Sequence, residues 1–107
     1  MGGRGRASES YYLHEGQQGK HIEGHNNYIP GRSKITIPLK RLQELFEEYS
    51  GTGIRHGTRE LVNFEEVIGI HINDITGVET ETTWGTIHYK DDGGYHIVPA
   101  YPNNQGE

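Results

Sequence analysis

The amino-acid sequence predicts an α+β domain with several short strands and limited helix. Eleven isoleucines supply most of the expected core, and their β-branched side chains favour strands. Only 31 % of the 107 residues are hydrophobic and sixteen are glycine, so we expect a small core and many turns and loops. A chain of this length has room for one core. We therefore expect a flexible lead-in or linker at residues 1–7 and a single domain at residues 8–107.

The first part of the domain is predicted to hold a short helix and a long loop. Residues 8–14 are expected to form the helix, with Ser8 as its N-cap, and the glycine-bearing stretch 16–19 to end it. Residues 20–31 are polar and rich in Gly, Asn and Pro, which is typical of an ordered loop. Residues 33–37 alternate between the two faces of a brief strand.

The clearest secondary-structure prediction is a helix that follows Pro38. Proline suits the first turn of a helix, where its missing N–H is not needed. Apolar residues then recur at spacings of three and four, which places them on one face of the helix. They are Leu39, Leu42, Leu45, Phe46 and Tyr49. Gly51 and Gly53 are expected to end this helix.

The second half of the chain is predicted to consist of strands. Isoleucine alternates with other residues over 67–72, and the Asn-Asp-Ile-Thr-Gly stretch at 73–77 supplies a turn. Residues 78–83 alternate with acidic residues, as a partly exposed strand does. Gly85 is expected to mark a bulge or a change of direction. The expected strands are residues 67–72, 78–83, 86–90 and 95–100.

The last two of these strands are predicted to form a hairpin, and its loop length decides where two histidines point. The stretch Asp91-Asp92-Gly93-Gly94 between them is a strong turn signal. With a three-residue loop that ends at Gly93, His88 lies opposite His96 on one face of the sheet. A four-residue loop puts the two histidines on opposite faces. We favour the three-residue loop, because glycine then stands where a positive φ is needed.

Charge is distributed unevenly along the chain. Residues 1–41 hold seven Lys and Arg against three Asp and Glu, a charge of +4, whereas residues 42–107 hold three against twelve, a charge of −9, and the two add to the net charge of −5. A basic first part suits a phosphate-bearing partner such as a nucleic acid. A chance imbalance on a solvated surface is the alternative.

Cysteine is absent, which excludes a disulfide framework, a thiolate metal site and a cysteine nucleophile. No apolar run approaches the roughly 18–20 residues that span a bilayer, so no membrane partner is expected. No signal peptide opens the sequence. If the domain is exported, we expect the signal to lie on a larger protein.

Two segments of the chain carry the candidate chemistry. The candidate residues are Lys20, His21, Arg32 and Ser33 in the basic part, and His88 and His96 in the predicted hairpin. One reaction that uses two histidines, a guanidinium and hydroxyls is metal-independent RNA cleavage. A base takes the proton of the 2′-hydroxyl, the oxygen attacks the adjacent phosphorus, and an acid protonates the leaving 5′-oxygen. A planar guanidinium suits the phosphate, whose charge spreads during this reaction.

The other histidines have structural interpretations. His71, in the middle of an isoleucine-rich strand, is expected to be structural, and His14 and His56 to be incidental. His25 either braces the turn at residues 26–27 or contacts the substrate.

Two further candidates and a metal site also have alternatives. Arg32 either binds phosphate or forms a structural ion pair, and Thr83 either belongs to the site or only favours the strand. His21 and His25 have the spacing of two ligands on a helix, but Gly24 and the two asparagines after His25 argue against a helix there. We therefore expect no metal and no other cofactor.

Six short motifs, read together, resemble the blocks of the polymorphic toxin type 50 domain in the same order. The resemblance runs from about residue 16 to residue 102, most of the chain. The motifs are Lys20-His21-Ile22 with Gly24-His25-Asn26-Asn27-Tyr28, Gly31-Arg32-Ser33, Gly51-Thr52-Gly53, Val67-Ile68-Gly69, Thr83-x-x-x-Ile87-His88-Tyr89 and Gly94-x-His96-Ile97-Val98-Pro99.

The resemblance implies a fold, an activity and partners. The family is grouped with the barnase, EndoU, colicin and RelE-like ribonucleases, which implies one or two N-terminal helices packed on a small curved antiparallel sheet. It implies an endoribonuclease toxin at the C-terminal end of a larger delivery protein, secreted or displayed at the cell surface. Such a toxin acts in the cytoplasm of a competing bacterium, and a cognate immunity protein neutralises it. Separately from the resemblance, the limited basic surface favours a compact transfer RNA as the substrate, and messenger and ribosomal RNA stay open.

The family pattern also points to site residues. The catalytic candidates are His21, Arg32, Ser33, Thr83, His88 and His96. The substrate-binding candidates are Lys20, His25, Lys34, Thr86 and Tyr89. We expect His88 or His96 to act as the base and the other as acid or phosphate donor. Thr83 and His88 differ in strand parity, so Thr83 joins the site only through a bulge at Gly85. If the strand is straight, Thr86 is the better candidate.

Two other functions stay open at this point. The first is a non-enzymatic module on the same scaffold, such as a phage head-morphogenesis or RNA-binding domain, which would bind RNA without cleaving it. The second is a metal-dependent nuclease, which EDTA would inhibit. The set of three histidines and an arginine favours the metal-independent ribonuclease over both.

Overall fold

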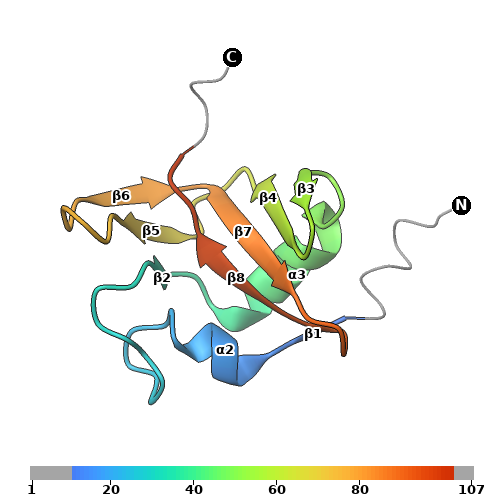
Figure 1. Ribbon diagram of the computed structural model, residues 1–107, viewed down its shortest axis with the longest axis horizontal. Coiled ribbons are helices and arrows are strands. Elements are labelled where there is room, and N and C mark those ends of the chain that lie inside the picture. The colour runs from blue at the N-terminus through green and yellow to red at the C-terminus, as the bar shows by residue number, and fades with distance from the viewer. Residues whose placement is uncertain (1–10, 103–107) are drawn as a thin grey trace, which may run out of the picture.

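The computed structural model describes residues 11–102 and has the α+β architecture that the sequence predicted (Figure 1). In this part of the chain, two helices accompany strands that form two sheets. The lead-in expected at residues 1–7 lies outside the described residues. Within residues 11–102, no helix is long and apolar enough to cross a membrane.

The larger sheet has five strands in the order β1-β8-β7-β4-β3. They are β1 (Tyr12–Leu13), β3 (Ile54–His56), β4 (Arg59–Asn63), β7 (Trp84–Tyr89) and β8 (Gly94–Pro99). All neighbours in this sheet are antiparallel except β1, which runs parallel to β8. The expected antiparallel sheet is therefore present, with one parallel pair at its edge.

A second sheet was not predicted as separate. It contains β2 (Lys34–Ile35), β5 (Gly69–Ile72) and β6 (Glu79–Thr82) in the order β2-β5-β6. Its strands are antiparallel, and β5 and β6 form the hairpin at the left of Figure 1. The turn at residues 73–77 closes that hairpin, as predicted.

The prediction of a helix at residues 8–14 is wrong over residues 11–14, the part that the structure describes. Tyr12–Leu13 form β1, and helix α2 occupies Glu15–Gly19 instead. His14 is the N-cap of α2, where its Nδ1 accepts the Gln17 N–H at 3.2 Å. The reason is tertiary, because β1 pairs with β8 and buries Leu13 in the core, which outweighs a weak local helix preference.

Helix α3, Leu39–Tyr49, confirms the strongest prediction. Leu42, Leu45 and Phe46 of its apolar stripe are fully buried, and the helix packs across one face of the larger sheet (Figure 1). The Phe46 ring stacks on Tyr95 of β8, with ring centroids 3.7 Å apart. Because Tyr95 and its alternate neighbours on β8 face this helix, the residues between them, including His96, face the opposite side of the sheet.

The bulge or change of direction expected at Gly85 is absent. Gly85 pairs regularly with Val62 on β4 and with Pro99 on β8. A Cβ on Gly85 would lie 2.9 Å from Ile68 Cδ1 and 3.0 Å from Ile97 Cγ2. Glycine is therefore required here by close core packing. The chain passes from one sheet to the other two residues earlier, at residue 83, between β6 and β7.

The hairpin of β3 and β4 escaped the sequence analysis. Gly57 forms its turn with a φ of +60°. On β4, an inward position that is usually apolar holds Glu60, which is fully buried. Its carboxylate accepts the N–H groups of Gly51 and Gly53, both at 2.8 Å, and the Tyr89 hydroxyl at 2.6 Å. A charged residue at this position hides the strand's alternation, which is why the pattern was missed.

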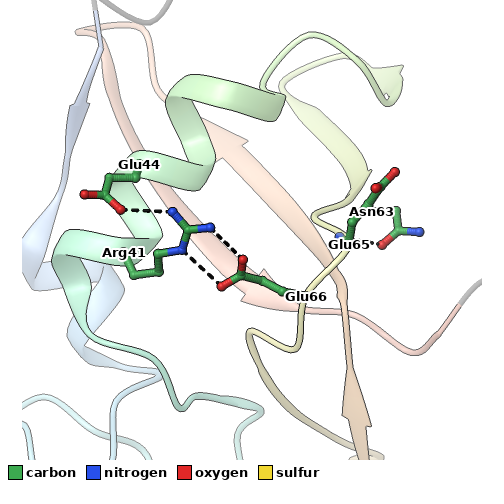
Figure 2. Close-up of polar contacts among 5 residues, drawn as sticks. All are labelled: Arg41, Glu44, Asn63, Glu65 and Glu66. Carbon is green, nitrogen blue, oxygen red and sulfur yellow. Dashed lines mark hydrogen bonds and ion pairs between the residues drawn. The ribbon is translucent and has the colours of Figure 1, made fainter.

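Polar contacts connect α3 to the segment that follows β4 (Figure 2). Arg41 donates to both carboxylate oxygens of Glu66, at 3.1 and 2.6 Å, and also to Glu44 at 3.0 Å. The Arg41 guanidinium lowers the pKa of Glu66. In the same segment the Glu65 N–H donates to the side chain of Asn63 at 2.9 Å, and Glu65 has a positive φ of 64°. These contacts hold the connection between the two sheets against the helix.

Candidate active site

Three imidazole rings form a stack on the face of the larger sheet that α3 leaves open. His88 and His96 are direct cross-strand partners, with ring centroids 4.7 Å apart and planes 8° apart. Gly93 has a φ of +94°, and the Lys90 N–H donates to the Gly94 carbonyl, so the predicted three-residue loop is confirmed. His21 adds the third ring, 6.2 Å from His96 and 13° from parallel.

The loop after α2 delivers His21 to this stack. Gln18 of α2 is fully buried, and its side-chain amide exchanges two hydrogen bonds with the backbone of Ile97 on β8, at 2.8 and 2.7 Å. These two bonds extend the pairing of β1 along β8, and they fix α2 against β8. Three residues later, the His21 carbonyl accepts the Ile35 N–H at 2.7 Å. The ring of His21 is 6 % exposed.

The tautomer of His21 follows from its hydrogen bond. Nδ1 lies 2.7 Å from the carbonyl oxygen of Ser33. A carbonyl oxygen can only accept, so Nδ1 carries the proton and donates it. The neutral ring therefore has its free lone pair on Nε2, which is the state a proton acceptor requires.

The stack lines a cleft of about 530 Å³ between the two sheets. The loop before β2 contributes Arg32 and Ser33, and the chain after β8 contributes Tyr101. The Ser33 hydroxyl oxygen accepts the Ile72 N–H at 2.8 Å, which ties this loop to β5. The volume is in the range of small-ligand sites in proteins.

Burial favours the neutral form of these three histidines in the free protein. Burial, together with the neighbouring His88 and His21, lowers the pKa of His96 to about 4. Burial also lowers the pKa of His88, with Arg59 and His21 adding to the effect. The pKa of His21 is lowered by burial too, although its hydrogen bond to Ser33 acts in the opposite direction. All three rings are therefore neutral at pH 7.

These shifts predict that the domain loses stability on acidification. Between pH 6.5 and pH 4 the unfolded chain takes up protons at these histidines, whereas the folded cleft takes up fewer, so a falling pH favours unfolding. The stability is complete above about pH 6.5. We expect the melting temperature to be about 10 °C lower at pH 4.5 than at pH 7. A His96→Gln variant should show a smaller drop, and an equal drop would contradict this origin.

Two ring nitrogens in the cleft are buried without a hydrogen-bond partner among the described residues. They are Nδ1 of His96 and Nδ1 of His71. Buried N–H groups are rarely left unpaired, so we place the proton of each neutral ring on Nε2. His96 therefore offers an N–H donor, where His21 offers an acceptor. At neutral pH the stack therefore holds a proton acceptor and a hydrogen-bond donor.

The structure brings together five of the six catalytic candidates. His21, Arg32, Ser33, His88 and His96 line the cleft. Thr83 does not line it, because its hydroxyl donates to the Asn63 side chain at 2.7 Å, at the crossing between the two sheets. Arg32 is exposed, and it forms no ion pair with another residue of the stretch 11–102.

None of the substrate-binding candidates lines the cleft. Thr86 is nearest in register, since it shares a face of β7 with His88 and pairs with Val98, which does line the cleft. With β7 straight at Gly85, Thr86 replaces Thr83 as the candidate hydroxyl. Tyr89 points to the helix side of the sheet, where its hydroxyl donates to the buried Glu60.

The basic-loop candidates have contacts of their own. The His25 ring accepts the Asn27 N–H at 3.0 Å and covers Gly19 so closely that a Cβ there would lie 2.3 Å from it. His25 thus braces its turn, which was the alternative considered for it. Lys34 pairs with Glu23 at 3.1 Å. Lys20 lies beside His21 in the chain and contributes to lowering its pKa.

Sequence reasoning missed four polar residues that line the cleft. They are His71, Asn73, Asp74 and Tyr101. His71 was expected to be structural, but its ring faces the cleft and meets Tyr101 edge-on, with centroids 5.6 Å apart. A histidine followed by an Asn-Asp turn was the available signal. Only the placement of the second sheet beside the first makes that signal meaningful.

Metal ligands do not converge in this cleft. Across residues 11–102, no group of three or more His, Asp or Glu side chains is placed to hold one metal ion.

Comparison with known protein families supports the resemblance inferred from the motifs. The family model described as bacterial toxin 50 matches residues 13–99, which is most of the chain. No curated protein matches the sequence.

Proposed function

Since the chain belongs to the bacterial toxin 50 family, we propose that it is a metal-independent endoribonuclease toxin. It cleaves RNA by attack of a 2′-hydroxyl on the adjacent phosphorus and leaves a 2′,3′-cyclic phosphate. The observation that supports this is the stack of His21, His96 and His88 in one cleft with Arg32 and Ser33. These side chains supply a proton acceptor, proton donors and a cation for the phosphate.

His21 is the proposed general base. Its Nδ1–H is held by the Ser33 carbonyl, so Nε2 is free to take the proton of the 2′-hydroxyl. Its lowered pKa keeps the ring neutral at pH 7. This assignment differs from the sequence-based expectation, in which His88 or His96 was the base, because the hydrogen bond to Ser33 was not visible in the sequence.

His88 and His96 act on the phosphate and the leaving group. His96 donates its Nε2–H to a phosphate oxygen. A bound phosphate brings a negative charge beside both rings, which raises the pKa of each. One of the two rings then takes up a proton from the solvent and delivers it to the leaving 5′-oxygen, so that the acid forms only when the substrate is bound.

Arg32 and Ser33 complete the phosphate site. The exposed guanidinium of Arg32 neutralises the charge that spreads over the phosphoryl oxygens in the transition state. The Ser33 hydroxyl oxygen accepts the Ile72 N–H, so its hydrogen is left to donate to a phosphoryl oxygen.

The toxin role suggests how the domain is delivered, which RNA it cleaves and how the producing cell is protected. We propose that the domain is carried by a larger protein to a competing bacterium and acts in its cytoplasm. A cognate immunity protein protects the producer. A compact transfer RNA is the proposed substrate, because a domain with a limited basic surface depends on recognition of RNA shape.

The test is cleavage of total bacterial RNA by the purified domain in EDTA, with the RNA ends mapped. We expect discrete fragments with 2′,3′-cyclic phosphate termini. His88→Ala should lower the rate at least about 100-fold, because a general acid–base group contributes about that much. His56→Ala is the matched control, since His56 is exposed on β3 and does not line the cleft.

Two outcomes would separate the alternatives. Cleavage that EDTA abolishes and a divalent metal restores would indicate a metal-dependent nuclease. RNA that the folded domain binds but leaves intact would indicate a non-enzymatic module. Either result would overturn the proposed mechanism.

A further inference from the structure

A second cavity adjoins the histidine cleft. Its volume is about 510 Å³, and it extends from the cleft toward the turn of the β5–β6 hairpin, at the left of Figure 1. The two cavities share a wall that includes Arg32 and Asp74. None of the three stacked histidines lines the second cavity. It therefore offers room beside the catalytic groups without taking part in proton transfer.

Any RNA that presents a phosphate to the histidines must place a nucleoside on each side of that phosphate. The shared wall puts Arg32 where the chain would pass from one cavity to the other. The second cavity is therefore in position for a neighbouring nucleoside. This step rests on the proposed ribonuclease function.

Most polar side chains at the hairpin turn are already engaged. The Asn73 side chain accepts the N–H groups of Ile75 and Thr76, at 2.8 and 3.0 Å, and the Thr76 hydroxyl accepts the Val78 N–H at 3.2 Å. The carboxylate of Asp74, by contrast, has no hydrogen bond or ion pair with another described residue. Beside it, the apolar side chain of Ile75 is 90 % exposed.

A carboxylate in an RNA-binding cavity repels phosphate, so its partner is an N–H of a base or a hydroxyl of a ribose. The apolar side chains of Pro30 and Ile75 in the same cavity favour the base. A free carboxylate accepts two parallel N–H bonds. Of the four bases, guanine alone presents two adjacent N–H donors, N1–H and N2–H, on its Watson–Crick edge. Adenine and cytosine present one amino group beside a bare nitrogen, and uracil presents one N–H between two carbonyls. Single-stranded RNA leaves this edge open to a protein.

We propose that the second cavity is a guanine-selective nucleobase subsite. Asp74 accepts the two N–H groups of the base, and Pro30 and Ile75 provide apolar contacts to its ring. Arg32, on the shared wall, binds the phosphate that joins this nucleoside to the next.

The test compares the wild type with Asp74→Asn in two measurements. In the first, an RNA of random sequence is cleaved and the ends are sequenced. We expect guanine to be enriched at one position next to the cleaved bond, and Asp74→Asn to lower kcat/KM for guanine-containing sites by about 10- to 100-fold. Sites with other bases should change little. Asp91→Asn is the control, since Asp91 is exposed in the β7–β8 loop and lines neither cavity.

The second measurement does not depend on cleavage. The isotope-labelled domain is titrated with the four nucleoside 3′-monophosphates, and the amide shifts of residues 74–77 are followed by NMR. Guanosine 3′-monophosphate should bind more tightly than the other three, and Asp74→Asn should remove the difference. Equal binding of all four, or a preference that survives Asp74→Asn, would overturn the subsite. Selective binding of guanosine 3′-monophosphate without RNA cleavage would support the subsite. It would contradict only the proposed ribonuclease activity.

Discussion

His21→Asn is expected to lower kcat/KM for RNA cleavage by about 100- to 10,000-fold while the domain stays folded. The side-chain amide of asparagine can take the place of Nδ1–H, so the hydrogen bond to the Ser33 carbonyl is retained. The Nε2 lone pair is lost, and with it the proposed acceptor of the 2′-hydroxyl proton. Initial rates with a short RNA, at several substrate concentrations, measure the effect.

The pH profile of this variant separates catalysis from structure. In the wild type, kcat/KM should rise with pH as the free base loses its proton, with a midpoint below pH 6.5 because the pKa of His21 is lowered. At higher pH it should fall again, because the proposed acid, His88 or His96, has to take up a proton. That rise should be missing in His21→Asn. A variant that keeps the same rise, or that keeps the wild-type rate, would show that His21 is not the base. His56→Asn serves as a matched control on the exposed strand β3.

The largest expected effect on stability comes from Glu60→Ala. Removal of the carboxylate leaves three donors without their acceptor: the N–H groups of Gly51 and Gly53 and the hydroxyl of Tyr89. Each unpaired donor costs about 1–3 kcal/mol to the extent that it stays buried, so we expect a loss of about 3–5 kcal/mol in the free energy of unfolding. Urea denaturation measures it.

Two further variants make this prediction specific. Glu60→Gln keeps one acceptor oxygen and should lose less stability than Glu60→Ala. Glu81→Ala removes an exposed carboxylate on β6 and should change the stability by no more than about 0.5 kcal/mol. If Glu60→Ala were as stable as Glu81→Ala, the buried carboxylate would have no structural role.

The predictions that succeeded rest on local rules. The apolar residues of α3 recur with the period of a helix, so they lie on one face, and that face is buried against the larger sheet. In the loop between β7 and β8, Gly93 stands where a positive φ is required. The length of this loop sets His88 opposite His96. Both were readable because neighbours in the chain decide them.

The predictions that failed depend on partners that are distant in the chain. Tyr12–Leu13 form a strand because β8 pairs with them, and Gly85 is glycine because Ile68 and Ile97 pack on it. The β3–β4 hairpin was hidden because its inward position holds a buried Glu60 whose acceptor role involves Tyr89. No periodicity in the sequence reports such contacts.

For the candidate site as well, local sequence determined one part and contacts between distant segments decided the rest. The sequence by itself determined the α+β class, the family, helix α3 and the cross-strand pair of histidines, because period, turn chemistry and motif order are local properties. Only the tertiary structure decided that His21 joins the stack, that its free lone pair is on Nε2, and that Asp74 borders the cleft. These depend on packing one sheet beside the other, where burial and hydrogen-bond partners are set by segments far apart in the chain.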